Sequence, residues 1–187
     1  PLVGMASEMK AQKELICEVA EDTMALCGTK LTYLVGTMIE LPRAAVTAGN
    51  IAKDAEFFSF GTNDLTQTTY GFSRDDSAKF TSFYMDRQDR CPNCQRTNVD
   101  WKKMLCRMCK STIERKADNI LDFDPFSTID REGVGAMMTW AIRDGRQTRP
   151  NIKLGICGEH GGEPKSIDFC HRAGLDYVSC SPYRVPI

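Results

Sequence analysis

Residues 33–43 read YLVGTMIELPR. The stretch is apolar until it reaches the carboxylate of Glu40, and Pro42 then occupies a position suited to the first turn of a helix. This order of residues predicts a buried strand, an acid at the strand end and a helix after it. Ligands of α/β sheets bind at the edge where such strands end. The stretch therefore predicts an α/β fold with Glu40 at its ligand-binding edge.

The same pattern returns three times along the chain, at residues 57–60, 153–157 and 177–180. These apolar runs break at the sequences GTND, GEH and SP, respectively. Because parallel strands end at the same edge of a sheet, each run should deliver polar groups to one shared place. The candidate site is therefore built from several separate segments.

Helices are expected between these strands, over residues 7–21, 43–53, 64–71, 127–146 and 163–173. Ser7 and Asp64 can cap two of them. The first helix carries Leu15, Ile16 and Val19 on one face. Strand and helix alternate at a spacing of about 25 residues, which is typical of a parallel sheet with right-handed crossovers. Four strands and a remnant at the amino end fit either a small open sheet or part of a closed barrel.

The composition is that of an ordinary globular protein, with 42% hydrophobic and 26% charged residues in 187 and a net charge of -1. This balance does not favour a general nucleic-acid or membrane partner. We find no signal peptide and no apolar run long enough to span a membrane. Nine cysteines, most of them isolated within expected helices or strands, favour a reducing compartment, and we expect a cytoplasmic protein.

Two acids, Glu40 and Asp64, follow neighbouring strands. Carboxylates at this place suit Mg²⁺ or Mn²⁺, which take hard oxygen ligands and keep several waters for a substrate to displace. Each acid alone could equally be a helix cap or an ion-pair partner. Cys157 alone could be a small buried apolar residue.

Four longer strings resemble the C-terminal domain of the pyruvate phosphate dikinase family. They are GTMIELPRAA at 36–45, FFSFGTNDLTQTTYGFSRDD at 57–76, GICGEHGGEPKSIDF at 155–169 and AGLDYVSCSPYRVPI at 173–187. Phosphoenolpyruvate synthases and enzyme I of the sugar phosphotransferase system share the TND or SND loop but look different in the last two strings. The resemblance covers nearly the whole chain outside residues 84–122.

The resemblance implies the C-terminal part of a (β/α)8 TIM-type barrel that interconverts pyruvate and phosphoenolpyruvate. The phosphoryl group would pass to or from a phosphohistidine domain of the same full-length protein. Carried over by position, Glu40 and Asp64 would hold Mg²⁺, and Cys157 would donate the proton at the methyl carbon. The substrate would be contacted by Glu40, Gly61, Thr62, Asn63 and Asp64.

These roles are chemically consistent. Removing a methyl proton from pyruvate creates an enolate, whose charge a divalent ion stabilises. A thiol, with a free pKa of about 8.5, can carry a proton both ways near neutral pH. Glu159 and His160 could tune the thiol of Cys157 or brace its loop.

The chain also departs from the family. Two substrate-binding arginines of the family's barrel, its phosphohistidine segment and its nucleotide-binding domain have no counterpart here. We therefore expect roughly the last five strands of a barrel, a homodimer when the protein is complete, and little or no turnover from this piece alone.

Cysteines at 91, 94, 106 and 109 form a paired CxxC signature, with eleven residues between the pairs. This spacing lets Cys91, Cys94, Cys106 and Cys109 surround one Zn²⁺ ion tetrahedrally. Unrelated thiols and a redox pair are the alternatives. Residues 84–122 look like an insertion between the barrel parts 1–83 and 123–187, and a closed four-cysteine site would give this zinc-ribbon-like loop the stability that its few apolar residues cannot.

The expected insertion is basic and contains Trp101, as some nucleic-acid-binding zinc ribbons do. Its cations are Arg87, Arg90, Arg96, Lys102, Lys103, Arg107, Lys110, Arg115 and Lys116. A solvated loop, or a contact with another subunit, is favoured over nucleic-acid binding. The competing functions are a zinc-ribbon binding module on a degenerate barrel, a phosphoenolpyruvate synthase-like enzyme, and another Mg²⁺-dependent enolate enzyme such as a lyase.

Overall fold

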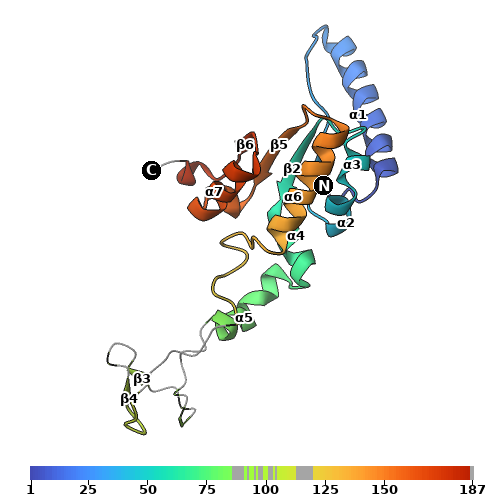
Figure 1. Cartoon of the computed structure of the whole chain (residues 1–187). Coiled ribbons are helices and arrows are strands. Elements are labelled where there is room, and N and C mark those ends of the chain that lie inside the picture. Colours follow the sequence, from blue (N-terminus) through green and yellow to red (C-terminus); the bar gives the residue numbers. More distant parts are fainter. Residues whose placement is uncertain are drawn as a thin grey trace. The chain divides into compact units, whose positions relative to one another are not determined.

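The computed structural model describes residues 1–85, 91, 93–94, 96, 99–100, 103, 105–112 and 120–185. The chain forms two compact units, one of Pro1–Phe72 with Pro125–Ile187 and one of Ser73–Asp124 (Figure 1). The expected insertion, residues 84–122, falls within the second unit. Trp101 and five of its basic residues lie outside the described residues: Arg87, Arg90, Lys102, Arg115 and Lys116.

The first unit is built on a parallel sheet. Its strands are β1 (Thr37–Ile39), β2 (Phe57–Gly61), β5 (Lys153–Cys157) and β6 (Tyr177–Val178), in the order β1-β2-β5-β6. All three neighbouring pairs are parallel, so the predicted mixed α/β fold with a parallel sheet is confirmed. The register pairs Gly61 with Cys157. The last residues of β2 and β5 therefore lie side by side.

Helices connect and cover these strands. They are α1 (Ala6–Cys27), α2 (Pro42–Val46), α3 (Ala48–Ile51), α4 (Thr62–Tyr70), α6 (Val134–Thr148) and α7 (Pro164–Ala173), with short 3-10 turns η2 (Glu159–Gly162) and η3 (Pro182–Arg184). Helix α6 packs against α2 and α3, and Figure 1 shows α7 at the β6 end of the sheet. The core includes Phe58, Phe60, Leu154 and Ile156, all fully buried. The burial of these side chains anchors β2 and β5 in the core.

Several predicted boundaries are wrong. Helix α1 begins after Met5 and α4 begins after Gly61, so neither Ser7 nor Asp64 is a cap residue. The helix expected over residues 43–53 is interrupted at Thr47, which separates α2 from α3. The strand expected from residue 33 begins only at Thr37.

Helix α6 begins at Val134 rather than near residue 127. The side chain of Asp130 accepts hydrogen bonds from the amides of Glu132, Gly133 and Val134, at 3.1, 3.0 and 3.3 Å. These bonds satisfy amides that have no partner within a helix, so they favour a start at this point. The periodicity of apolar residues could not reveal that start.

The predicted face of α1 does not pack on the core. Leu15, Ile16 and Val19 are 54%, 45% and 56% exposed. Met9, at 2% exposure, is the buried residue of this helix. Apolar spacing therefore predicted the helix but not which of its faces packs on the core.

The second unit contains α5 (Arg74–Met85) and a two-stranded antiparallel sheet of β3 (Val99–Asp100) and β4 (Leu105–Cys106). Helix α5 is not among the helices that the sequence predicts. Asp75 and Asp76 lie in its first turn, where negative charge is favourable, and Lys79 pairs with Asp76 at 2.6 Å. Among the described residues, none of the helices combines the length and the apolar character that crossing a membrane requires.

Glu163 caps helix α7. Its carboxylate accepts from the amides of Lys165 and Ser166 at 3.0 and 2.7 Å and from the Ser166 hydroxyl at 2.6 Å. Burial acts to raise the pKa of Glu163, but these hydrogen bonds outweigh it and hold the pKa below its usual value of 4.5. The folded chain therefore stabilises the ionised form of the Glu163 carboxylate.

We expect the change Glu163→Gln to cost about 1 kcal/mol near neutral pH, because the cap loses its charge. A lowered pKa gives stability that is present above the unfolded value and is lost as the pH falls through the folded value. The difference between the two proteins should thus shrink below pH 4.5. Urea unfolding at several pH values measures it, with Glu132→Gln as the control. An equal difference at all pH values would contradict the assignment.

Candidate functional site

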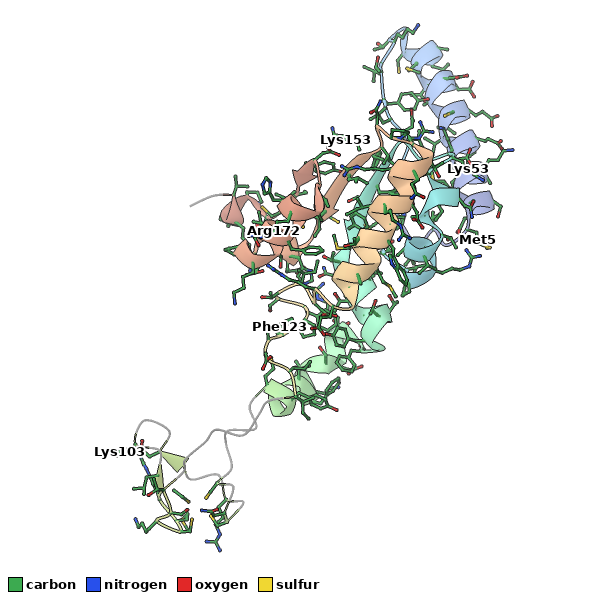
Figure 2. The ribbon with its side chains drawn as sticks, in the orientation of Figure 1. Met5, Lys53, Lys103, Phe123, Lys153 and Arg172 are labelled. Carbon is green, nitrogen blue, oxygen red and sulfur yellow. The ribbon has the colours of Figure 1, made fainter. Side chains whose placement is uncertain are left out.

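The predicted site residues lie at the carboxyl edge of the sheet. Glu40 directly follows β1, Gly61 ends β2 and Cys157 ends β5. Lys153, labelled in Figure 2, marks the opposite, amino end of β5, where its ammonium group lies 5.5 Å from the ring centre of Tyr177. The parallel strands therefore bring together segments that are more than a hundred residues apart in sequence, as Glu40 and Cys157 are.

Glu40 is 3% exposed and packs against Gly61. The amide of Leu2 donates to its Oε1 atom. A Cβ atom on residue 61 would lie 2.8 Å from Glu40 Oε2 and 2.6 Å from Met38 Sδ, so any side chain there would force these neighbours to move. Glycine at position 61 thus makes room for the buried carboxylate.

Asn63 and Asp64 lie in the first turn of α4. Asp64 is exposed, and the carboxylate of Glu159 accepts a 2.8 Å hydrogen bond from Asn63 Nδ2. Asn63 Oδ1 is buried and has no hydrogen-bond partner within the part of the chain that the structure describes. A buried oxygen of this kind is suited to accept from a ligand or to contact a cation.

Cys157 is partly exposed, and its sulfur lies 3.7 Å from the carbonyl oxygen of Phe60. The thiol is thus held at the end of β5 next to the end of β2. It is not packed as a core residue, unlike Cys170, whose pKa burial raises to about 11. Cys157 is therefore a residue of the sheet edge and not of the buried core.

His160 braces the site. It is fully buried; Nε2 lies 3.0 Å from the carbonyl oxygen of Pro125 and Nδ1 lies 2.7 Å from Thr62 Oγ1. Because a carbonyl oxygen only accepts, Nε2 carries a proton, and in the neutral ring Nδ1 accepts from the Thr62 hydroxyl. Both nitrogens are engaged, so His160 joins α4 to the turn after β5, which agrees with the bracing interpretation.

The change Thr62→Val should destabilise the folded chain by about 1–3 kcal/mol, because it leaves a buried imidazole nitrogen without its partner. The matched control is Thr68→Val, which removes the hydroxyl of an exposed threonine that bonds Asp64 O at 2.7 Å within its own helix. Chemical unfolding compares the two variants. Equal, small effects would show that the buried bond contributes no more than the exposed one.

A pocket of about 370 Å³ opens at this edge. Its lining residues are Asn63, Gly158, Glu159, Ser179, Cys180, Ser181 and Arg184. Sequence reasoning placed Asn63 in the site and left out Ser181 and Arg184, although the polar break after residue 180 was a signal for them. The predicted residues Glu40, Asp64 and Cys157 lie at the same edge of the sheet but do not line this pocket.

The second unit holds the cysteine cluster. The sulfur atoms of Cys91, Cys94, Cys106 and Cys109 all lie within 4.8 Å of one another. Two pairs are separated by 3.6 Å (Cys91 and Cys109) and 3.7 Å (Cys94 and Cys106). Zn–S bonds of about 2.3 Å in a tetrahedron give S···S separations of about 3.8 Å. The four thiols therefore fit a zinc ion, and the structure brings together all four predicted ligands.

The short strands and the turn of the second unit position two of these thiols. The antiparallel pair of β3 and β4 carries Cys106, and the turn that follows brings the amide of Cys109 to 3.5 Å from Cys106 Sγ, just before the left-handed residue Lys110. Hydrogen bonds from the Ser111 hydroxyl and amide lower the pKa of Cys109 to about 6. A thiol that ionises readily is suited to metal ligation, because the thiolate is the ligand.

Comparison with known proteins identifies relatives of the chain. The family described as PEP-utilising enzyme, PEP-binding domain, matches residues 1–187. The chain is 48% identical over 187 residues to a pyruvate, phosphate dikinase of Clostridium symbiosum, covering 100% of this chain and 18% of that protein. It is also 48% identical over 187 residues to a chloroplastic pyruvate, phosphate dikinase of Mesembryanthemum crystallinum and one of Rhizobium meliloti, covering 100% of this chain and 16% and 17% of theirs. The chain thus spans less than a fifth of the length of these relatives.

Proposed function

The chain belongs to the PEP-utilising enzyme family, whose PEP-binding domain it matches over its whole length, and from this premise we propose that it is the pyruvate- and phosphoenolpyruvate-binding part of a pyruvate, phosphate dikinase. One observation carries the proposal beyond similarity. A single parallel sheet gathers Glu40, the turn from Gly61 to Asp64, and Cys157 at its carboxyl edge. In α/β folds this edge is where substrates bind.

The proposed half-reaction exchanges a phosphoryl group between a phosphohistidine and the enolate of pyruvate. When phosphoenolpyruvate gives up its phosphoryl group, an enolate remains. The thiol of Cys157 then delivers its proton to the methylene carbon and becomes a thiolate, and pyruvate is formed. In the other direction the thiolate removes a methyl proton. The exposed side of Cys157 and its place beside Gly61 support this role.

The donor set at the edge fits Mg²⁺. Glu40 and Asp64 offer hard carboxylate oxygens, and the unpartnered Oδ1 of Asn63 is a further oxygen, within the described residues, that a cation or a donor could satisfy. A magnesium ion held by Glu40 and Asp64 would supply positive charge where the enolate oxygen becomes negative. Gly61, Thr62 and Asn63 would orient the substrate through the backbone and side-chain amide groups at the start of α4.

The architecture we propose is the C-terminal part of a (β/α)8 barrel, formed by residues 1–83 and 123–187. Four adjacent parallel strands with connecting helices support it. The phosphohistidine would come from another domain of the full-length protein, which would be a homodimer in a reducing compartment such as the cytoplasm. Because this chain spans 18% of its relative from Clostridium symbiosum, we expect little turnover from it alone.

We propose a structural zinc site in residues 84–122, an insertion between the two barrel parts. The close approach of the four sulfur atoms, with two pairs at 3.6 and 3.7 Å, supports this site. All four ligand positions are filled by cysteines, which leaves none open for a substrate. The cysteine site does not favour a zinc-ribbon binding module over an enzyme as the function of the chain. The acids and the thiol that the enzyme would need are also present at the sheet edge.

The full-length protein that contains this chain tests the function. We expect it to convert ATP, pyruvate and phosphate into AMP, phosphoenolpyruvate and diphosphate, with no turnover in the absence of phosphate or of magnesium. The change Asp64→Asn should raise the magnesium concentration needed for half-maximal rate by about tenfold or more, since a ligand loses its charge. Turnover without phosphate would instead favour a phosphoenolpyruvate synthase-like enzyme, and no turnover of pyruvate would refute the proposal.

A further inference from the structure

Glu159 and Asn63 meet across the sheet edge. Asn63 lies in the first turn of α4, after β2, and Glu159 opens the short turn η2, after β5. Asn63 Nδ2 donates to Glu159 Oε2 at 2.8 Å, although the two residues are 96 positions apart. Both side chains line the pocket of about 370 Å³. The pair therefore lines a pocket at the same edge of the sheet as the candidate site.

The chemistry of this contact fixes the direction of the Asn63 amide. A carboxylate can only accept, so it binds the NH₂ end of the amide and not the oxygen. The Oδ1 atom must then point away from Glu159, and it is buried without a partner in the described part of the chain. A neutral amide in place of Glu159 could bind either end of Asn63, and an apolar residue could bind neither.

The backbone supports the approach of the two residues. Gly158, between Cys157 and Glu159, has a φ of 95°, in the region that favours glycine. A Cβ atom there would lie 3.2 Å from Asn63 Nδ2, so a larger residue would crowd the amide. The same short segment thus carries the proposed proton donor and the carboxylate that holds Asn63.

A carboxylate next to a site for an anionic substrate is electrostatically unfavourable. Glu159 would repel the carboxylate and phosphate groups of phosphoenolpyruvate if its charge were free to face them. The hydrogen bond from Asn63 partly compensates this charge, and the charge in turn holds the Asn63 amide in one orientation. This explains why an acid, and not a glutamine of the same size, suits the position.

We propose that Glu159 is a positioning residue, which holds the amide of Asn63 with its oxygen turned away from Glu159 so that this oxygen can contact the substrate or its metal ion. This inference rests on the proposed function of the sheet edge. It assigns to Glu159 no contact with the reacting atoms.

The test uses the full-length protein with the variants Glu159→Gln, Glu159→Ala, Asn63→Ala and the double variant Asn63→Ala with Glu159→Ala. The readouts are kcat and KM for the half-reaction of pyruvate, and separately the rate of the nucleotide half-reaction. Glu132→Gln, an exposed acid outside the pocket, is the control. Because Glu159→Gln preserves size, it keeps the test informative should the alanine variants fold poorly.

We expect Asn63→Ala and Glu159→Ala each to lower kcat for pyruvate by about 10- to 100-fold, as small errors in positioning do. The double variant should be no slower than the slower single one, because both changes remove the same oriented amide. Glu159→Gln should retain an intermediate rate, since the amide can then adopt either orientation. The nucleotide half-reaction should be unchanged throughout.

Three results would overturn the inference. If the losses multiply in the double variant, or if Glu159→Ala and Glu159→Gln keep the full rate while Asn63→Ala does not, Glu159 does not act through Asn63 and the proposed function still stands. If Asn63→Ala itself keeps the full rate, the substrate-binding role of the α4 turn falls, and the inference falls with it.

Discussion

Replacing Cys157 with alanine in the full-length protein should slow the pyruvate half-reaction by about 10²- to 10⁴-fold, the usual contribution of a positioned acid or base. The thiol is partly exposed at the end of β5, next to the end of β2, and so can meet a carbon atom bound at the sheet edge. Alanine keeps the strand but cannot carry a proton. KM should change far less than kcat, because the thiol acts on the reacting carbon and not on the charged groups that bind the substrate.

The measurement is the exchange of label between pyruvate and phosphoenolpyruvate, run beside the nucleotide half-reaction of the same preparation. Cys27→Ala, at the exposed last residue of α1, is the matched control and should keep the full rate. Cys157→Ser adds a second test, because a hydroxyl is a much weaker acid than a thiol and should rescue little of the rate. A Cys157→Ala protein with undiminished exchange would remove the thiol from the mechanism.

Removing the metal from the cysteine cluster should unfold the structure around it. Structural zinc contributes about 10–16 kcal/mol of apparent binding free energy in small zinc-binding peptides, far more than a two-stranded sheet contributes by itself. Within the described residues, β3 and β4 pair residues 99–100 with 105–106, and Leu105 forms one further bridge to Thr112. We therefore expect Cys106→Ser, or a strong chelator, to abolish the protection of its amides from hydrogen exchange.

Zinc content measures the same event directly. The unmodified protein should carry about one zinc ion per chain in this four-cysteine site, and Cys91→Ser or Cys106→Ser should carry much less. Cys27→Ala again serves as the control, because it removes a thiol outside the cluster. A protein with no zinc, or with a hydrogen-exchange pattern that ignores chelation, would instead favour free thiols or a redox pair.

The first helix shows which of its features the sequence predicts and which appear only in the structure. A helix over residues 7–21 follows from apolar spacing, and α1 does form there, but it extends over Ala6–Cys27 and ends at Gly28, which has the left-handed conformation of a helix end. Its start has no side-chain cap, so no residue signals it. Leu15 and Val19, which share the predicted face, remain exposed in this chain. Periodicity thus predicts that a helix exists better than it predicts where it ends or what it touches.

The sequence by itself determined the parallel α/β fold, the acids and the thiol at strand ends, and the four cysteines of the cluster. These features follow from patterns within short segments: alternating strands and helices, an apolar run that breaks at a polar residue, and two CxxC pairs. The tertiary structure alone decided that Gly61 pairs with Cys157, that Asn63 binds Glu159, and that His160 joins Thr62 to Pro125. The physical reason is that each of these contacts joins segments far apart in sequence. Such contacts depend on strand order and register, which packing of the whole core selects and no short segment encodes.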